Sequence, residues 1–174
     1  VREIKKILIY GLPEKYGYSL DFLYFCMKHR VKVDIYERKI GKILNLKKII
    51  RKLKTKRIED FRLKDIEIVE KINKDYDLIL SCEVLQSLNK KELKEHVYNI
   101  NNYSKHSLIF VPNKDNKNHK RLSHLEGYTL KSLMSLFENI AAYGYIDMPP
   151  SPPGARRKKK IKSRMIINML TLFA

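Results

Sequence analysis

Glycines and acids follow two short apolar runs near the start of the sequence, and their spacing suits a nucleotide-type ligand. Gly11 and Gly17 bound a turn after the run Lys6–Tyr10, and Glu37 ends the run over residues 31–36. A glycine turn lets a cofactor approach the backbone, and an acid ending the next strand can accept hydrogen bonds from both ribose hydroxyls. We therefore take Gly11, Gly17 and Glu37 as candidate cofactor contacts.

Further polar residues occupy corresponding places later in the chain. Ser81, Cys82 and Glu83 end a buried run that begins at Tyr76, and Asn113 follows a run over residues 107–111. In an open α/β sheet, ligands bind outside the carboxyl ends of the strands. We expect Ser81, Cys82 and Glu83 to line the floor of the pocket. Asp60, in a possible strand over residues 57–62, is assigned to the adenine.

The elements that would position these residues alternate between strands and helices, which predicts a mostly parallel sheet with helices on both faces. We expect a Rossmann-like, doubly wound α/β fold with an antiparallel C-terminal strand, in one domain over residues 1–174. Asn89 with Glu92 forms a capping-box pattern, and Thr129 can cap a later helix. The periodicity predicts strands over residues 6–10, 31–37, 57–62, 76–82, 107–111, 142–148 and 163–173, and helices over 20–29, 43–53, 66–73, 89–101 and 129–139.

Two downstream segments resemble the class I S-adenosylmethionine (SAM)-dependent methyltransferases. Residues 77–88 resemble the strand that ends in a Glu-Val-Leu-x-His-Leu run, with Ser87 at the His position. Residues 108–113 and 127–133 resemble the strand and helix that follow, with His119 and His124 in the loop between them. Of the family's first motif, Asp/Glu-x-Gly-x-Gly-x-Gly, only Gly11 and Gly17 remain, so that motif is degenerate. The resemblance covers most of the chain.

The resemblance implies SAM as the cofactor, and an acceptor site that includes Asn113, His119, His124 and Tyr128. His119, His124 and Tyr128 are also the candidates for a general base, which is needed only for acceptors with a proton to lose. The simpler interpretation is that both histidines are solvated loop residues. Glu37 could likewise be an ordinary surface acid paired with Arg38. No third ligand of suitable type accompanies the histidines, so no metal site is expected.

Positive charge is concentrated in two segments of this chain of net charge +18. Residues 38–57 hold ten Lys or Arg and residues 156–164 hold seven, with no acid in either segment. Arg156 and Arg157 open the second segment, which we expect at the rim of the site. Two basic surfaces near one rim suggest a phosphate-bearing acceptor, either RNA or an anionic small molecule. A lysine-rich solvated surface is the alternative.

Three functions therefore remain open: a SAM-dependent methyltransferase, a non-catalytic methyltransferase-like protein that binds RNA or a protein partner through its basic surfaces, and a nicotinamide-dinucleotide Rossmann protein. Apolar runs are too short for a membrane helix, and the first residues do not resemble a signal peptide. Cys26 and Cys82 are expected to be buried free thiols, which favours a reducing, cytoplasmic location.

Overall fold

The computed structural model describes residues 4–12, 23, 26, 29–55, 65–115, 127–137, 139–147 and 168–173. In chain order the elements are β1 Lys6–Tyr10, β2 Lys32–Tyr36, α2 Ile40–Thr55, β3 Ile66–Val69, β4 Leu78–Cys82, the 3-10 turn η2 Leu85–Ser87, α3 Lys90–Tyr103, β5 Ser107–Pro112, α5 Leu130–Met134, β6 Ala142–Asp147 and β7 Asn168–Phe173.

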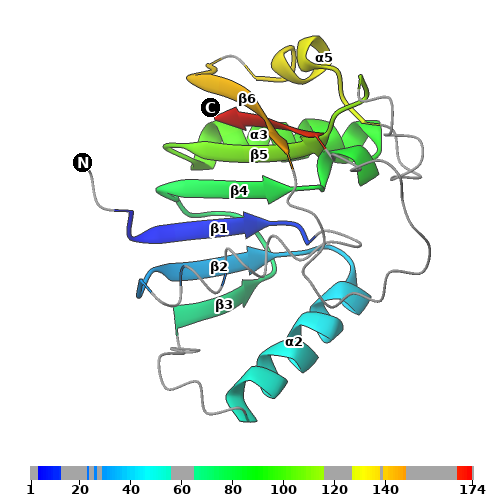
Figure 1. Ribbon diagram of the computed structural model, residues 1–174. Coiled ribbons are helices and arrows are strands. Elements are labelled where there is room, and N and C mark those ends of the chain that lie inside the picture. The colour runs from blue at the N-terminus through cyan, green and yellow to red at the C-terminus, as the bar shows by residue number, and fades with distance from the viewer. Residues whose placement is uncertain are drawn as a thin grey trace, which may run out of the picture.

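These strands form one sheet of seven strands in the order β3-β2-β1-β4-β5-β7-β6 (Figure 1). Strands β1 to β5 are mutually parallel, and β7 lies antiparallel between β5 and β6. The strand order reverses between β1 and β4, and ligands of open α/β sheets bind at such a point. The expected doubly wound α/β fold with an antiparallel C-terminal strand is confirmed.

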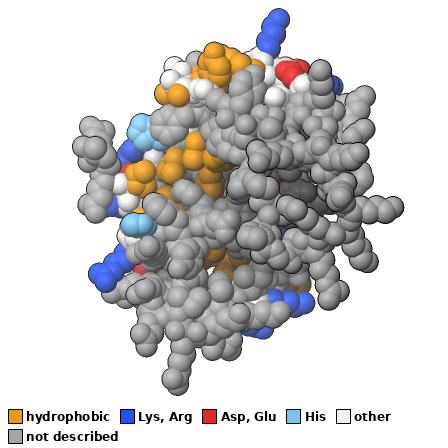
Figure 2. Space-filling model, viewed as in Figure 1, with side chains coloured by type: hydrophobic (Ala, Val, Ile, Leu, Met, Phe, Trp, Pro, Cys, Tyr) orange, Lys and Arg blue, Asp and Glu red, His pale blue; other side chains and the backbone are white. Residues whose placement is uncertain are grey.

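Strand β1 is apolar on both sides because each of its faces packs against its own core. Ile7 and Ile9 belong to one cluster with Leu46 of α2 and the helical residues Leu23 and Cys26. The alternate β1 side chains join a second cluster, in which α3 and α5 cover the other face of the sheet. Successive strand residues point to opposite faces, so a strand covered on both sides needs a continuous apolar run. On the face seen in Figure 2, hydrophobic side chains of the described residues gather in the upper and left-central part of the view.

The expected capping residues start both helices of the second face. The Asn89 side chain accepts hydrogen bonds from the backbone of Lys91 and Glu92, and Glu92 accepts one from the Asn89 N–H. This is the predicted capping box at the start of α3. Thr129 caps α5, but that helix ends at Met134 instead of near residue 139. Among the described helices, none has the length and apolar character needed to cross a membrane.

The expected helix over residues 66–73 is wrong, because Ile66–Val69 is strand β3. Its residues pair in parallel with β2, from Val33 opposite Ile66 to Tyr36 opposite Val69. Four residues are too few to show a clear helical period, and parallel pairing with β2 makes this segment a strand. The strand expected over residues 57–62 lies outside the described residues. The connection from β3 to β4, residues 70–77, is short and contains no helix, although parallel strands are usually joined by a longer helical crossover.

Candidate functional site

The turn after β1 needs glycine at position 11 for two reasons. Gly11 has φ of 85°, in the left-handed region that other residues rarely adopt. A Cβ atom there would lie 2.7 Å from both Cγ atoms of Val84, in the segment after β4. The Gly11 N–H donates a 2.8 Å hydrogen bond to the carbonyl of Tyr36 at the end of β2. The carboxyl ends of β1, β2 and β4 are therefore packed tightly around this glycine.

Glu37, directly after β2, ties the β1 turn to the start of α2. Its carboxylate accepts hydrogen bonds from the backbone N–H of Leu12 at 2.7 Å and of Lys39 at 2.8 Å. The Lys42 ammonium lies 3.9 Å from the same carboxylate and donates to the Leu12 carbonyl. The Glu37 side chain is only 7% exposed. The alternative interpretation as a surface acid paired with Arg38 is therefore wrong.

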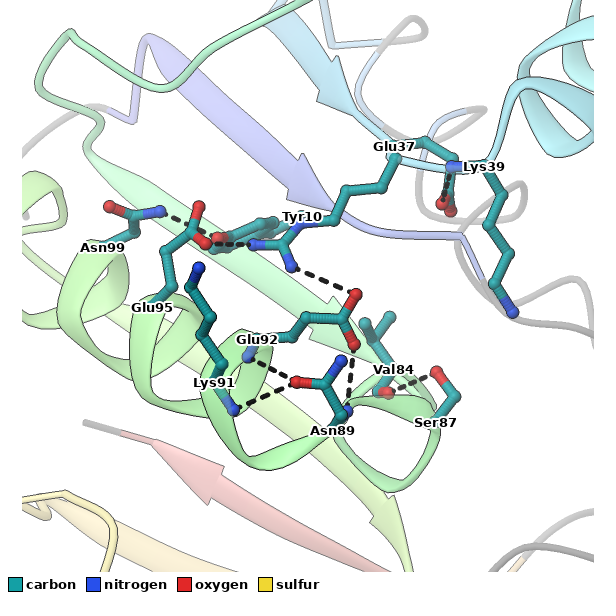
Figure 3. Close-up of polar contacts among 11 residues, drawn as sticks. Tyr10, Glu37, Lys39, Val84, Ser87, Asn89, Lys91, Glu92, Glu95 and Asn99 are labelled. Carbon is teal, nitrogen blue, oxygen red and sulfur yellow. Dashed lines mark hydrogen bonds and ion pairs between the residues drawn. The ribbon is translucent and has the colours of Figure 1, made fainter.

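Arg38 instead reaches from β2 to α3 across the end of the sheet. Its guanidinium lies 2.9 Å from a Glu95 oxygen and 3.5 Å from a Glu92 oxygen. Figure 3 shows Glu92 and Glu95 turned from α3 toward the end of β2. Glu92 also closes the capping box of α3, so one carboxylate serves both the helix start and the bridge. This Arg38 bridge spans the cleft between β2 and α3.

Beneath the bridge lies a stack of Tyr10 on His96. The two rings are 3.6 Å apart at an interplanar angle of 20°, and the Asn99 amide donates to the Tyr10 hydroxyl at 2.8 Å. The His96 ring also meets Ser81 of β4, with 2.9 Å between Nε2 and Oγ. Burial, with a smaller contribution from the Arg38 charge, lowers the pKa of His96 to about 3. The ring is therefore neutral at physiological pH, and burial also raises the pKa of Tyr10.

These groups line a cleft at the carboxyl edge of the sheet. The cleft encloses about 70 Å³. Typical small-molecule pockets are larger, at roughly 300–1000 Å³. Arg38, Val84 and Gly11 are among the residues that border this small space. The residues that line the cleft are Tyr10, Gly11, Tyr36, Glu37, Arg38, Lys39, Lys42, Val84, Ser87, Leu88, Glu92 and His96.

Two of the expected cofactor residues, Gly11 and Glu37, line this cleft, and three others lie beside it. Ser81 is fully buried and faces His96. Cys82 is 2% exposed, and burial, followed by the nearby Glu83 charge, raises the pKa of its thiol to about 12. Glu83 has φ of 54°, and burial raises the pKa of its carboxyl. A side chain other than glycine in this conformation is strained, and such strain concentrates at functional sites.

Two expected acceptor residues, Asn113 and Tyr128, lie next to each other after β5. Their backbones form a parallel bridge, and the Asn113 side chain accepts a hydrogen bond from the Asp115 N–H. The Tyr128 hydroxyl donates to the carbonyl of Leu85 in η2 at 3.3 Å. Burial raises the pKa of Tyr128, so its hydroxyl stays protonated at physiological pH.

Six expected site residues fall outside the described part of the chain: Gly17, Asp60, His119, His124, Arg156 and Arg157. Because β3 is Ile66–Val69, the residue that follows its carboxyl end is Glu70, and Asp60 precedes the strand. Within the described ranges, no three His, Cys, Asp or Glu side chains are grouped so as to hold a metal ion.

Tyr10, Arg38 and His96 line the cleft but were not predicted as members of the site. Tyr10 ends an apolar run and His96 lies within a helical pattern, so both resemble core residues. Arg38 resembles the first member of a basic run. One signal was present in the sequence. Glu92 and Glu95 lie three residues apart, so they share one face of α3 and can engage a single cation.

Comparison with solved structures places this fold among methyltransferases. TehB from Haemophilus influenzae is similar with a TM-score of 0.61 at 16% identity, over 97% of this chain and 56% of TehB. A SAM-dependent methyltransferase from Archaeoglobus fulgidus is similar with a TM-score of 0.61 at 9% identity, over 98% of this chain and 86% of that one. The N-terminal domain of EvdMO1 with SAH bound is similar with a TM-score of 0.58 at 10% identity. The match covers 98% of this chain and 74% of that domain's chain. This chain therefore has the class I methyltransferase fold.

The likeness is one of structure alone. No protein-family model and no curated protein sequence matches the chain. The chain spans little more than half the length of TehB.

The residues at the carboxyl edge fit SAM in their chemistry. A carboxylate follows β2, a left-handed glycine turn follows β1, and the aliphatic side chains of Val84 and Leu88 line the cleft. The enclosed space is smaller than such a ligand needs, and the Glu37 oxygens already accept backbone N–H groups. A bound cofactor would have to displace the Arg38 bridge or Val84.

Proposed function

We propose that this protein is a SAM-dependent methyltransferase. The observation that carries the proposal is the hydrogen bond of Glu37 to the β1 turn, whose strand borders the point where the strand order reverses. In Rossmann-type sheets, a carboxylate after the second strand meets the ribose of the bound nucleotide. The cofactor supplies the reactive methyl group, and the protein supplies orientation and exclusion of water.

Each described residue at the cleft has a role that follows from its contacts. Glu37 would bind the ribose hydroxyls, and the Gly11 turn would let the cofactor approach the backbone. Val84 and Leu88 would pack against apolar parts of the cofactor. Cys82 is protonated and buried, so it does not act as a nucleophile in this arrangement.

For the acceptor we propose a molecule that carries phosphate. Lys39 and Lys42 line the cleft, and α2 continues from them with further Lys and Arg. Cationic side chains around an opening raise the local concentration of anionic substrates. Arg156 and Arg157 remain predicted members of this rim, and His119, His124 and Tyr128 remain the candidates for a general base.

The strand order favours a methyltransferase over the nicotinamide-dinucleotide alternative. Dinucleotide-binding sheets of the common type have the order 3-2-1-4-5-6. Here β7 is inserted antiparallel between β5 and β6. The non-catalytic alternative keeps the same fold, so only binding and activity distinguish it.

Calorimetric titration with SAM and S-adenosylhomocysteine tests the proposal, with NADH as the competing ligand. We expect binding of the first two and not of NADH. Glu37→Ala should abolish binding because the carboxylate is lost. Glu67→Ala serves as the matched control, because Glu67 is an exposed acid in β3, away from the cleft.

Thermal melting without ligand separates a lost ligand contact from a lost fold, since Glu37 also holds the backbone of Leu12 and Lys39. A folded wild-type protein that binds neither SAM nor S-adenosylhomocysteine would exclude the methyltransferase proposal and favour the non-catalytic alternative.

A further inference from the structure

The outward face of α2 carries a basic stripe that the cleft does not use. Lys47, Lys48 and Arg51 are all exposed, and none of them forms an ion pair with another described residue. Residues three and four apart lie on one face of a helix, so the three cations form one patch. The opposite face of α2 points inward through Leu46, which is 3% exposed.

The same stripe begins with two exposed aliphatic side chains. Ile40 is 73% exposed and Leu44 is 53% exposed, and their spacing of four residues places them in line with Lys47, Lys48 and Arg51. Only three other large hydrophobic residues in the described part are exposed. An apolar pair followed by a cluster of cations offers bases or sugars an apolar surface to pack on and attracts negative charge.

The stripe leads directly to the cleft. Helix α2 starts beside the end of β2 at the carboxyl edge and runs obliquely away past β3 (Figure 1). Lys39 and Lys42, at the start of α2, line the cleft, and Lys47, Lys48 and Arg51 follow further along the helix. Helix α2 contains 16 residues. At a rise of about 1.5 Å per residue, the helix is about 24 Å long. A ligand along α2 would be an extended chain whose end reaches the cleft.

We propose that single-stranded RNA docks along α2, with its phosphates on Lys47, Lys48 and Arg51 and its bases or sugars over Ile40 and Leu44. Sequence-tolerant binding of single strands combines positive charge along the backbone with side chains against which the bases lie. In most such proteins those side chains are aromatic, whereas here they are the aliphatic Ile40 and Leu44. The inference deepens the proposed function by naming the acceptor class. RNA binding itself is measurable without SAM, so either idea can fail alone.

Two other partners fit this surface less well. A helix that lies on a membrane needs its apolar face free. The apolar face of α2 instead packs against the sheet through Leu46. Double-stranded RNA is recognised over about 16 base pairs across two minor grooves. That footprint is broader than one helix stripe, so a single strand is the occupant that the geometry favours.

The test is fluorescence anisotropy with a labelled single-stranded oligouridylate, without SAM, over a range of salt concentrations. The triple variant Lys47→Gln, Lys48→Gln, Arg51→Gln should bind more weakly at low salt, by roughly tenfold or more. Each phosphate contact on a single strand contributes about 0.7 to the slope of log affinity against log salt, so the slope should fall by about 2.

Lys90, Lys91 and Lys94 on α3 provide a matched control, because all three are exposed and lie on a different helix. Their triple Gln variant loses the same charge and should bind RNA as the wild type does. Equal weakening by both triple variants would overturn the proposal, because binding would then follow net charge alone. The proposal would also be overturned if the α2 triple variant kept its RNA affinity but lost binding to phosphatidylserine vesicles, because the stripe would then bind lipid.

Discussion

His96 shows at the scale of one residue how this core holds a polar group. The ring is 2% exposed, stacks on Tyr10 and has its Nε2 beside the Ser81 hydroxyl. A buried polar group without a partner costs about 1–3 kcal/mol, so the Ser81 contact makes the burial tolerable. Burial disfavours a charged ring, and the nearby Arg38 guanidinium disfavours it further, so the ring stays neutral.

The depressed pKa of His96 predicts a pH dependence of stability. In the folded protein the pKa of His96 is about 3, below the ordinary value of 6.5. Below pH 6.5 the unfolded chain therefore binds a proton that the folded protein excludes. This contribution to stability is complete above pH 6.5 and is lost as the pH falls toward the pKa of about 3 that His96 has in the folded protein. The loss is at most about 1.4 kcal/mol per pH unit.

Urea unfolding of the wild type and of His96→Gln at several pH values between 7 and 4 measures this effect. We expect the variant to be less stable at pH 7 but to lose less stability on acidification. His106→Gln is the control, since His106 is an exposed histidine outside the core. Parallel pH profiles for wild type and His96→Gln would contradict the assignment of a buried neutral ring.

At the scale of the element, α3 links the capping of a helix to the closure of the cleft. One Glu92 oxygen accepts the Asn89 N–H, and the other lies near Arg38. The side chains of Asn89 and Glu92 therefore orient the start of α3 and one end of the Arg38 bridge together. The ion pairs are partly exposed and contribute only about 0–1 kcal/mol each, so the cap matters more for stability.

Asn89→Ala should reduce the free energy of unfolding by about 0.5–2 kcal/mol. The reason is that two N–H groups at the start of α3 lose their acceptor. Asn89→Asp should retain most of the stability, since Asp is an equally good cap. Chemical denaturation followed by circular dichroism measures both variants. Asn73→Ala, an exposed position in the β3–β4 connection, should change little, and an equal effect at both positions would rule out the capping role.

At the scale of the whole molecule, β7 joins two parts of the sheet that are distant in sequence. It pairs from Pro112 opposite Met169 to Leu108 opposite Phe173, and along its other side with all of β6. Without β7, both β5 and β6 would expose unpaired N–H and C=O groups. Exposed sheet edges of this kind invite pairing with other chains.

Deletion of residues 168–174 should therefore give a protein that aggregates or loses its cooperative melting transition. Size-exclusion chromatography and thermal denaturation provide the measurement. Phe173→Ala in the full chain retains every backbone hydrogen bond of β7 and is the milder comparison. A deletion variant that stays monomeric with an unchanged melting temperature would show that β7 is dispensable to the sheet.

Local sequence signals predicted most of the fold. The continuous apolar runs of β1 and β4, the alternation in β2 and the capping box at Asn89 each specify an element through contacts within a few residues. The order of strands and helices then leaves few topologies, because crossovers between parallel strands have one hand. Gly11 and Glu37 could be chosen as site residues because they follow these strands directly.

Other features depend on contacts between distant parts of the chain, which no local pattern carries. Ile66–Val69 became a strand only because β2 offered a partner. Arg38 pairs with Glu92 and Glu95 and not with the adjacent Glu37. The Glu37 carboxylate accepts hydrogen bonds from the backbone of Leu12 and Lys39 instead. The sequence by itself determined most of the elements and the residues that follow β1, β2, β4 and β5. The tertiary structure decided which charges pair and how closely Val84 packs on Gly11, because both follow from the spacing between packed elements.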